Sequence, residues 1–197
     1  MIDRLSRRRI LTAGASTAAG LVLAGGASAQ QSLAPTPECR DGDEPTARET
    51  EGPFFKPRSP ERSDLREPNL KGRPIELSGL VLTRACRPVE RALVDLWHAD
   101  DGGEYDNKGF RLRGHVFTDA QGRYAFQTIV PGLYPGRTRH FHVKVQAPGK
   151  RVLTTQFYFP DEPGNRSDGL FNRRLLMQVS GAGENFAARF DVVLDVR

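Results

Sequence analysis

The sequence predicts an all-β fold in which two antiparallel sheets pack face to face as a β-sandwich. Short stretches of alternating apolar and polar residues recur along the chain, and turn signals rich in Gly and Pro separate them. About seven such stretches follow one another, which is typical of a small sandwich. The predicted strands cover residues 75–83, 92–97, 114–118, 123–129, 140–147, 152–159 and 187–196.

Turn signals indicate how neighbouring strands connect. Asp119-Ala120-Gln121-Gly122 and Pro148-Gly149-Lys150 each predict a hairpin between the strands on either side. Residues 161–178 are expected to form a long loop with one helical turn around residues 170–176. The body should therefore consist of short strands with one long excursion before the last of them.

The chain divides into three segments. Residues 1–29 have the features of an export signal, and residues 75–197 hold the predicted strands of the sandwich domain. Between them, residues 30–74 form a polar, Pro-rich arm without helical periodicity. We expect this arm to be irregular and to pack on the surface of the core.

The first segment fits a twin-arginine signal peptide. Ser6-Arg7-Arg8-Arg9-Ile10-Leu11-Thr12 matches the signature, and Ala27-Ser28-Ala29 offers the small residues of a cleavage site. The apolar run between them is short and rich in Ala and Gly, which argues against a stable membrane span. A periplasmic or secreted protein is the expected product, and a Sec-type signal that carries three arginines is the alternative.

The charge of the chain gives little sign of a polyanionic partner. The 197 residues carry a formal net charge of +5, and four arginines and one aspartate of the signal account for three of these charges. The remaining chain, at about +2, has no block of like charges, so nothing indicates nucleic-acid binding.

The chain has two cysteines, Cys39 and Cys86. In an exported protein an even pair favours one disulfide, which here would attach the arm to the body. Two unpaired thiols are the alternative.

Two histidines are spaced for a shared role. In the strand 140–147, His140 and His142 point to the same side because successive side chains alternate. Such a pair could hold one metal ion. Taken alone the pattern is weak, because most pairs of this kind are exposed or hydrogen-bonded histidines.

Two tyrosines strengthen the metal hypothesis. Tyr105 and Tyr134 lie in Gly-rich turns, whereas Tyr124 and Tyr158 lie within strand patterns and fit half-buried aromatics whose hydroxyls reach water. A phenol binds metal only after losing a proton of pKa near 10, which a hard ion such as Fe(III) can enforce. Zn(II) and Cu(I) prefer imidazole and thiolate. Two phenols with two imidazoles therefore indicate ferric iron and oxygen chemistry.

These residues stand in a recognisable order. Trp97-His98-Ala99-Asp100 with Tyr105, then Pro131-Gly132-Leu133-Tyr134-Pro135, then Arg137 with His140-Phe141-His142, resembles the intradiol ring-cleavage dioxygenases. That family comprises the catechol, hydroxyquinol and protocatechuate enzymes, and the resemblance runs from about residue 50 to residue 159. It implies a transthyretin-like sandwich that cleaves a catechol-type substrate with O2 between the two hydroxyl-bearing carbons, giving a muconate-type diacid.

The resemblance also assigns roles to residues. It implies one non-haem Fe(III) per chain and a catalytic part for Tyr134, which would leave the iron when substrate binds. Arg137 matches the position that stabilises the activated substrate. The implied iron ligands are Tyr105, Tyr134, His140 and His142, and the implied substrate-binding residues are Thr50, Gly52, Pro53 and Gln156.

Other functions and several details stay open at this point. An exported, metal-free transthyretin-like binding module is the main alternative, and hydrolysis with Cu(II) or Zn(II) is a third hypothesis that the paired phenols disfavour. A carboxylate on the substrate would need a cation, which Arg113, Arg139 or Lys144 could supply. The long helical segment that catechol-type members use for dimerisation has no counterpart, so the chain could be a monomer or a homo-oligomer. His98 and Trp97 are expected to be structural, with Trp97 packed inside the sandwich.

Overall fold

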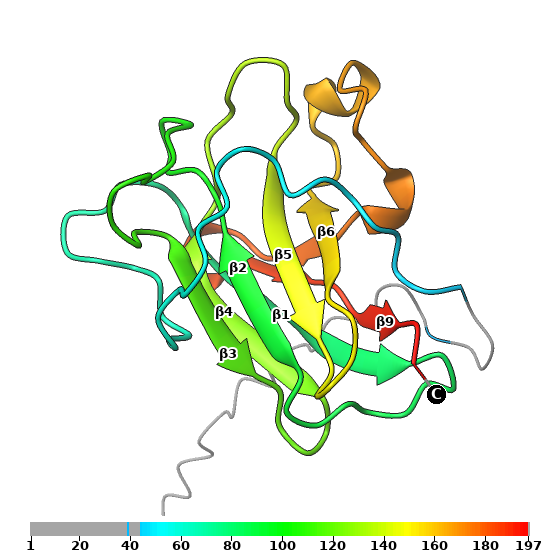
Figure 1. Cartoon of the computed structure of the whole chain (residues 1–197). Helices are drawn as coiled ribbons and strands as arrows, with labels where there is room; N and C mark the ends of the chain where they lie inside the picture. Colours follow the sequence, from blue (N-terminus) through cyan, green and yellow to red (C-terminus); the bar gives the residue numbers. More distant parts are fainter. Residues whose placement is uncertain (1–38, 40–43, 197) are drawn as a thin grey trace, which may run out of the picture. The chain divides into compact units, whose positions relative to one another are not determined.

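The computed structural model describes Cys39 and residues 44–196, and these residues form two β-sheets packed face to face (Figure 1). One sheet has the strand order β3-β2-β5-β6, and the other has the order β4-β1-β8-β7 with β9 also paired to β1. The predicted signal peptide lies outside the described residues. The strands are β1 (Pro74–Thr83), β2 (Leu93–Trp97), β3 (Arg113–Phe117), β4 (Arg123–Ile129), β5 (His140–Gln146), β6 (Leu153–Tyr158), β7 (Gln178–Ser180), β8 (Ala187–Arg189) and β9 (Val192–Leu194).

The first six predicted strands are confirmed to within one residue at either end, but one predicted hairpin is wrong. The turn Pro148-Gly149-Lys150 joins β5 and β6 as an antiparallel hairpin, as expected. The turn at residues 119–122 instead crosses from one sheet to the other, because β3 pairs with β2 and β4 pairs with β1. The same turn residues therefore build a corner of the sandwich.

The last predicted strand, residues 187–196, is interrupted. Its two parts, β8 and β9, both run parallel to β1, so this sheet is mixed and not purely antiparallel. Between them Asp191, which is completely buried, accepts a hydrogen bond from the backbone N–H of Leu80 at 2.9 Å. A side-chain oxygen replaces a backbone partner there, which explains the break in the ladder.

The long loop differs from its prediction in its helical content. It contains two 3₁₀ turns, η1 (Pro163–Arg166) and η2 (Arg173–Leu175), where the sequence predicted one helical turn. The loop ends at β7, a short strand that the sequence analysis did not predict.

The main apolar core lies between the two sheets. One side of each strand supplies it, and on β5 that side consists of Phe141, Val143 and Val145, all completely buried. Leu77 from β1 and Phe126 from β4 belong to the same cluster. Burial of this kind stabilises a fold by roughly 25 cal/mol for each Å² of apolar surface removed from water.

The arm covers the opposite, outer face of the β3-β2-β5-β6 sheet. Figure 1 shows the blue-to-cyan segment running across these strands. Glu49 N–H donates to the carbonyl of Thr154 on β6 at 2.9 Å, and Arg62 N–H donates to the carbonyl of His115 on β3 at 3.0 Å. The described part of the arm contains isolated bridges but no strand, in agreement with the expected irregular conformation.

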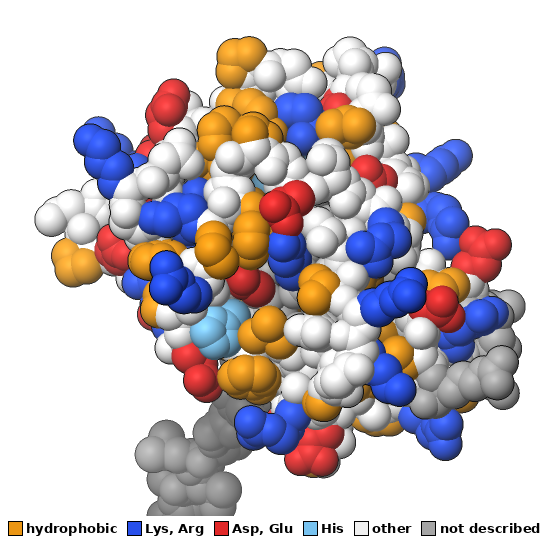
Figure 2. Space-filling view, in the orientation of Figure 1, with side chains coloured by type: hydrophobic (Ala, Val, Ile, Leu, Met, Phe, Trp, Pro, Cys, Tyr) orange, Lys and Arg blue, Asp and Glu red, His pale blue; other side chains and the backbone are white. Residues whose placement is uncertain are grey.

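Charges of both signs lie on the side of the molecule that the arm crosses. Figure 2 shows Lys and Arg side chains interspersed with Asp and Glu, and apolar side chains between them. Lys144 of β5 forms an ion pair with Glu51 of the arm, and its ammonium group lies 3.5 Å from the centre of the Phe55 ring. Polar and apolar contacts together therefore hold the arm on the sheet.

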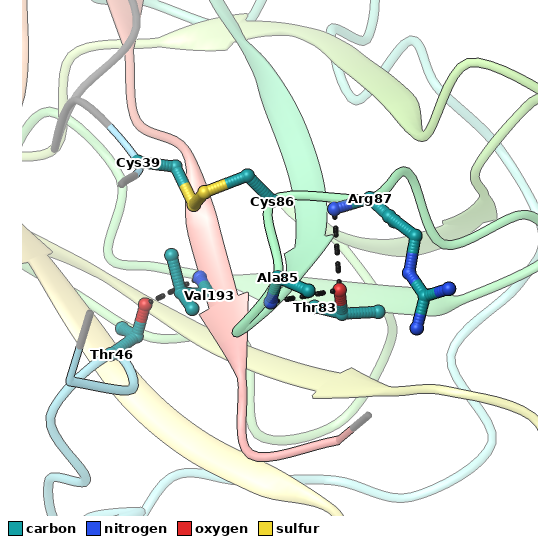
Figure 3. Close-up of a disulfide and its surroundings, with 7 residues drawn as sticks. All are labelled: Cys39, Thr46, Thr83, Ala85, Cys86, Arg87 and Val193. Atoms are coloured by element: carbon teal, nitrogen blue, oxygen red, sulfur yellow. Dashed lines mark hydrogen bonds between the residues drawn. A yellow bond between two sulfur atoms is a disulfide. The ribbon is translucent and has the colours of Figure 1, made fainter. Parts of the chain in front are cut away.

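A disulfide ties the start of the arm to the body (Figure 3). Cys39 is bonded to Cys86, which follows β1, and the two residues are 47 positions apart. Nearby, Thr46 exchanges two hydrogen bonds of 2.8 Å with the backbone of Val193 in β9. The structure thus contains the pairing that the sequence favoured over two free thiols.

No helix among residues 44–196 is both long enough and apolar enough to cross a bilayer.

Candidate active site

The register of the β3-β2-β5-β6 sheet brings several functional side chains into rows on its outer face. His142 lies opposite Trp97 of β2 and Gln156 of β6. His140 lies opposite Tyr158. All five side chains are at most 3 % exposed, because the arm and the loops at this end of the sheet cover them.

The two histidines face each other. Their Nε2 atoms are 3.1 Å apart, and His140 Nδ1 donates to the carbonyl oxygen of Thr138 at 2.6 Å. Nε2 of His140 is therefore a bare acceptor. Burial lowers the pKa of His140 to about 4 and that of His142 well below its usual value, with nearby positive charge adding to the effect. Both imidazoles are neutral near pH 7, the form that binds metal.

The two loop tyrosines complete the cluster. The ring of Tyr134 is centred 5.8 Å from that of His140, and the ring of Tyr105 is centred 6.0 Å from that of His142. The centres of the two phenol rings are 5.7 Å apart, and the rings meet edge to face at 81°. Burial, with Tyr134 close by, raises the pKa of Tyr105 well above its usual value, so this phenol ionises only if a strong positive charge is added.

This donor set fits a hard trivalent cation. Nδ1 of His142 is buried without a hydrogen-bond partner among the described residues, while the two Nε2 atoms face each other at 3.1 Å and share one proton between them. A cation bound to both Nε2 atoms would leave the proton of His142 on Nδ1, so that neither Nε2 atom would need a proton. Among residues 44–196 no three His, Cys, Asp or Glu side chains gather to hold a metal, so such a site would need the phenols.

Arg137 lies beside this cluster and is held on three sides. Its Nη1 donates to the hydroxyl of Tyr134 at 3.2 Å, and its Nη2 donates to Oε1 of Gln156 at 2.5 Å. Its Nε pairs with Asp168 at 2.9 Å. The guanidinium therefore has a fixed orientation toward the tyrosine that the sequence predicted to be catalytic.

The predicted substrate-binding residues of the arm fall in two groups. The carbonyl oxygen of Thr50 accepts from Gln156 Nε2 at 2.9 Å, and a Cβ added at Gly52 would lie 3.2 Å from His142 Cε1. Gly52 also has a φ of +69°, so a side chain there would be strained as well as crowded. Pro53 is exposed. The structure thus brings Thr50, Gly52 and Gln156 to the cluster and leaves Pro53 at the surface.

Three further aromatic residues lie next to the site: Phe54, in the arm segment that the resemblance placed at the pocket, Trp97, which sequence reasoning misplaced, and Tyr158, which it missed. Phe54 stacks on Tyr105 with ring centres 4.4 Å apart, and Trp97 stacks on His142 at 5.0 Å. Trp97 therefore packs on the outer face and not inside the sandwich as expected. Tyr158 is completely buried, and its hydroxyl lies 2.9 Å from Gln156 Oε1 and 2.8 Å from the carbonyl of Leu170, so it does not reach water. Only the strand pairing reveals the positions of Trp97 and Tyr158.

His98 has the structural role that the sequence predicted. It is buried, and its ring nitrogens bond to the carbonyl of Ala99 and the hydroxyl of Thr128, each at 2.7 Å. With both nitrogens satisfied, His98 has no lone pair left for a ligand.

Two of the three candidate cations for a substrate carboxylate are already paired. Arg139 pairs with Glu162 at 2.6 Å, and Lys144 pairs with Glu51. Arg113 is 1 % exposed and donates from Nε to the carbonyl of Asp106, but its two terminal nitrogens have no hydrogen-bond partner among the described residues.

Comparison with known proteins identifies relatives of this arrangement. Residues 50–195 match the family model described as Dioxygenase. The chain is 32% identical over 153 residues to the protocatechuate 3,4-dioxygenase beta chain of Burkholderia cepacia, covering 62% of this chain and 65% of that protein. It is 31% identical over 155 residues to catechol 1,2-dioxygenase 2 of Acinetobacter lwoffii, covering 66% of this chain and 56% of that protein. The chain therefore spans between about half and two thirds of the length of these curated relatives.

Solved structures agree with the sequence relatives. The dioxygenase domain of a dioxygenase–carbohydrate-binding fusion protein from Streptomyces sp. SirexAA-E is 55% identical, with a TM-score of 0.76 over 78% of this chain and 100% of that one. An intradiol ring-cleavage dioxygenase from Tetranychus urticae, at 22% identity, shares the fold with a TM-score of 0.71 over 78% of this chain and 95% of that one. On the match of the family model and the relatives together, the chain belongs to the intradiol ring-cleavage dioxygenase family.

Proposed function

We propose that this protein is a non-haem Fe(III) dioxygenase that opens a catechol-type ring between its two hydroxyl-bearing carbons and forms a muconate-type diacid. Both atoms of O2 enter the product. The observation that carries the proposal is the convergence of two neutral imidazoles and two phenols, with facing Nε2 atoms 3.1 Å apart. Membership in the dioxygenase family supports the same reaction class.

The four predicted ligands would hold one iron per chain. His140 and His142 would bind through Nε2, and Tyr105 and Tyr134 through their phenolate oxygens. When bound, Fe(III) supplies the positive charge that ionises the phenols and acts as a Lewis acid toward the two substrate oxygens. Stacking of Trp97 on His142 and of Phe54 on Tyr105 keeps two of these ligands in orientation.

Tyr134 and Arg137 are suited to the chemical steps. The phenolate oxygen of Tyr134 would accept a proton from a substrate hydroxyl, and the ring of Tyr134 is centred 5.8 Å from that of His140. Arg137 donates to that oxygen, so its charge already lies where the substrate oxygens would become negative. A fixed cation there stabilises the ketonised, electron-rich form of the ring.

The test is turnover of a catechol panel by the purified full-length protein loaded with iron. The panel contains catechol, hydroxyquinol and protocatechuate, and mass spectrometry identifies the product. We expect a product with the mass of the substrate plus both atoms of O2, and incorporation of both labels from ¹⁸O₂. Protein that binds iron but turns over none of these compounds would contradict the proposed reaction.

A pair of tyrosine variants tests the assignment of the site. Tyr134→Phe should lose iron, visible colour and turnover, because the phenol is both ligand and base. Tyr124→Phe makes the same chemical change at a buried tyrosine whose hydroxyl bonds to the carbonyl of Phe190, and it should keep all three. A colourless wild-type protein that takes up no ferric ion would favour the metal-free binding module.

We also propose that the protein is exported by the twin-arginine route to the periplasm or beyond. The signature at Arg7 and Arg8 supports this, as does the disulfide between Cys39 and Cys86, which needs an oxidising compartment. Replacing Arg7 and Arg8 by lysine should leave the protein, and its dioxygenase activity, in the cytoplasmic fraction. Unchanged export of the lysine variant would point to the Sec-type alternative.

A further inference from the structure

The long loop between β6 and β7 is docked on the turn that carries Tyr134 and Arg137. Thr138, in that turn, donates from its hydroxyl to Oδ1 of Asn165 at 2.7 Å. A Cβ added at Gly164 would lie 3.1 Å from the Cβ of Thr138, so the two backbones approach closely. The loop is therefore part of the wall of the candidate active site.

Asp168 is the point at which this loop holds the arginine. Its Oδ2 accepts from Nε of Arg137 at 2.9 Å and also from the backbone N–H of Thr138 at 2.9 Å. Its Oδ1 accepts from the backbone N–H of Leu170 at 2.9 Å. The carboxylate side chain is 3 % exposed, so water competes little for these bonds. One carboxylate thus ties together the side chain and the backbone of the turn and the loop itself.

These contacts fix the direction of the guanidinium. Because a guanidinium is planar, binding Nε at one edge determines where Nη1 and Nη2 point. Here they point at the hydroxyl of Tyr134 and at Oε1 of Gln156. Pro135 and Gly136, at the tip of the turn, add little restraint, because both are exposed and a Cβ added at Gly136 would meet nothing within 4 Å.

We infer that Asp168 is a positioning residue for the dioxygenase reaction, holding Arg137 so that its terminal nitrogens face the reacting oxygens. This inference rests on the proposed function. It assigns to the loop a role that neither the sequence pattern nor the family resemblance gave it. Asp168 hydrogen-bonds none of the predicted iron ligands, and its direct route to the chemistry is the bond to Arg137. A second, longer route runs through the backbone of Thr138, whose carbonyl accepts from His140.

The test compares three variants of the iron-loaded, full-length protein. Asp168→Ala should lower kcat/KM for catechol about 10²-fold, mostly through kcat. The reason is that a displaced Arg137 no longer stabilises the negative charge that develops on the substrate during the reaction. Asp168→Asn keeps the shape and should lose about tenfold. Glu162→Gln is the matched control, because Glu162 lies in the same loop as Asp168 and forms an ion pair of 2.6 Å with Arg139. The kcat/KM of this variant should stay within about twofold of the wild-type value.

A double variant separates positioning from general structural damage. Adding Asp168→Ala to Arg137→Ala should cost little further activity, because the main residue through which Asp168 acts is already gone. Iron content and the visible band should be unchanged in the single variants. Independent losses that multiply in the double variant, or wild-type kcat and KM in Asp168→Ala, would overturn the inference.

A measurement without turnover keeps the inference distinct from the proposed function. Hydrogen exchange of the peptide that contains Thr138 should be at least tenfold faster in Asp168→Ala than in wild type and Glu162→Gln, because its amide donates to the lost carboxylate. A wild-type protein that turns over no catechol would refute the proposed function. Unchanged exchange at Thr138 would refute the role of Asp168 whatever the reaction.

Discussion

At the end that holds the candidate site, both faces of the β3-β2-β5-β6 sheet are buried, but by different partners. Phe141 and Val143 point inward and pack against the second sheet, and both are 0 % exposed. His142 and Gln156 point outward and are 1 % and 0 % exposed, because irregular chain covers them. The inner face packs against the apolar side chains of the second sheet. The outer face packs against the arm and the loops, which supply backbone hydrogen-bonding groups and charged side chains.

The difference shows where a sandwich can place chemistry. The inner face is mostly apolar and needs few hydrogen bonds, so it is nearly complete once it is packed. The outer face buries polar groups, and most of them find partners in the arm or the loops. The exceptions lie close to one another in the sheet register: His142 Nδ1, Trp97 Nε1 and the terminal nitrogens of Arg113 have no partner among the described residues. On this sheet, the unmet groups therefore gather at the end that holds the candidate site.

Neighbouring residues on β5 offer the sharpest contrast between the faces. Phe141→Ala should destabilise the protein by about 3–5 kcal/mol, because it leaves a cavity between the sheets. His142→Ala should cost less stability but should abolish iron binding and turnover. Urea unfolding of the metal-free proteins and iron analysis of the loaded ones check both. A His142→Ala protein that keeps its iron would remove the distinction between the faces.

Arg137 tests whether an outer-face cation acts on the reaction. Arg137→Ala should lower kcat about 10³-fold, the upper part of the range for removing one fixed electrostatic stabiliser. Arg137→Lys should recover only part of this loss, because a lysine cannot contact Tyr134, Gln156 and Asp168 together. Steady-state kinetics with catechol measures the effect, and equal activity of all three proteins would contradict it.

The disulfide tests how firmly the cover of the outer face is attached. Replacing both Cys39 and Cys86 by serine should cost about 2–4 kcal/mol, since the bond closes a segment of 47 residues in the unfolded chain. Thermal unfolding of the variant beside the oxidised and reduced wild type measures this. Hydrogen exchange should become faster in the arm near Thr46 and stay unchanged in β5. Faster exchange in β5 would show that the two faces are not independent.

Asp95 gives the smallest effect, on the outer face beneath the arm. It accepts from Ser59 Oγ at 2.8 Å, and burial raises its pKa above the usual 3.8 despite this bond. A raised carboxyl pKa means that its contribution to stability is complete below pH 3.8 and is lost as the pH rises through the higher folded value. Asp95→Asn should therefore gain stability relative to the wild type above this window. Urea unfolding as a function of pH checks the sign, and a constant difference between the two proteins would contradict it.

The inner face was the more predictable half of the molecule. Alternation along 140–147 and 152–159 gave the strands and placed Phe141 and His142 on opposite sides. The two-residue spacing of the histidines and the Gly-rich setting of the tyrosines also predicted four side chains that the structure brings together. Each of these features is local in the sequence, which is why it could be recognised.

The features that sequence reasoning missed depend on pairing between distant segments. Trp97 and Tyr158 reach the site because β2 and β6 pair with β5 in one register, and a slip of one residue would turn both away. Asp168 meets Arg137 across 31 positions through a loop without periodicity. The turn at 119–122 has residues typical of a hairpin, but its two flanking strands do not pair with each other. β3 pairs with β2 and β4 pairs with β1, and these partners are distant in the sequence.

The central claim is that two imidazoles and two phenols bind one ferric ion, and the iron content of the purified protein tests it most directly. Elemental analysis after reconstitution with ferric salt should give one iron per chain, together with the visible absorption of tyrosinate bound to Fe(III). A protein that retains its fold but holds no stoichiometric iron after reconstitution would contradict the account.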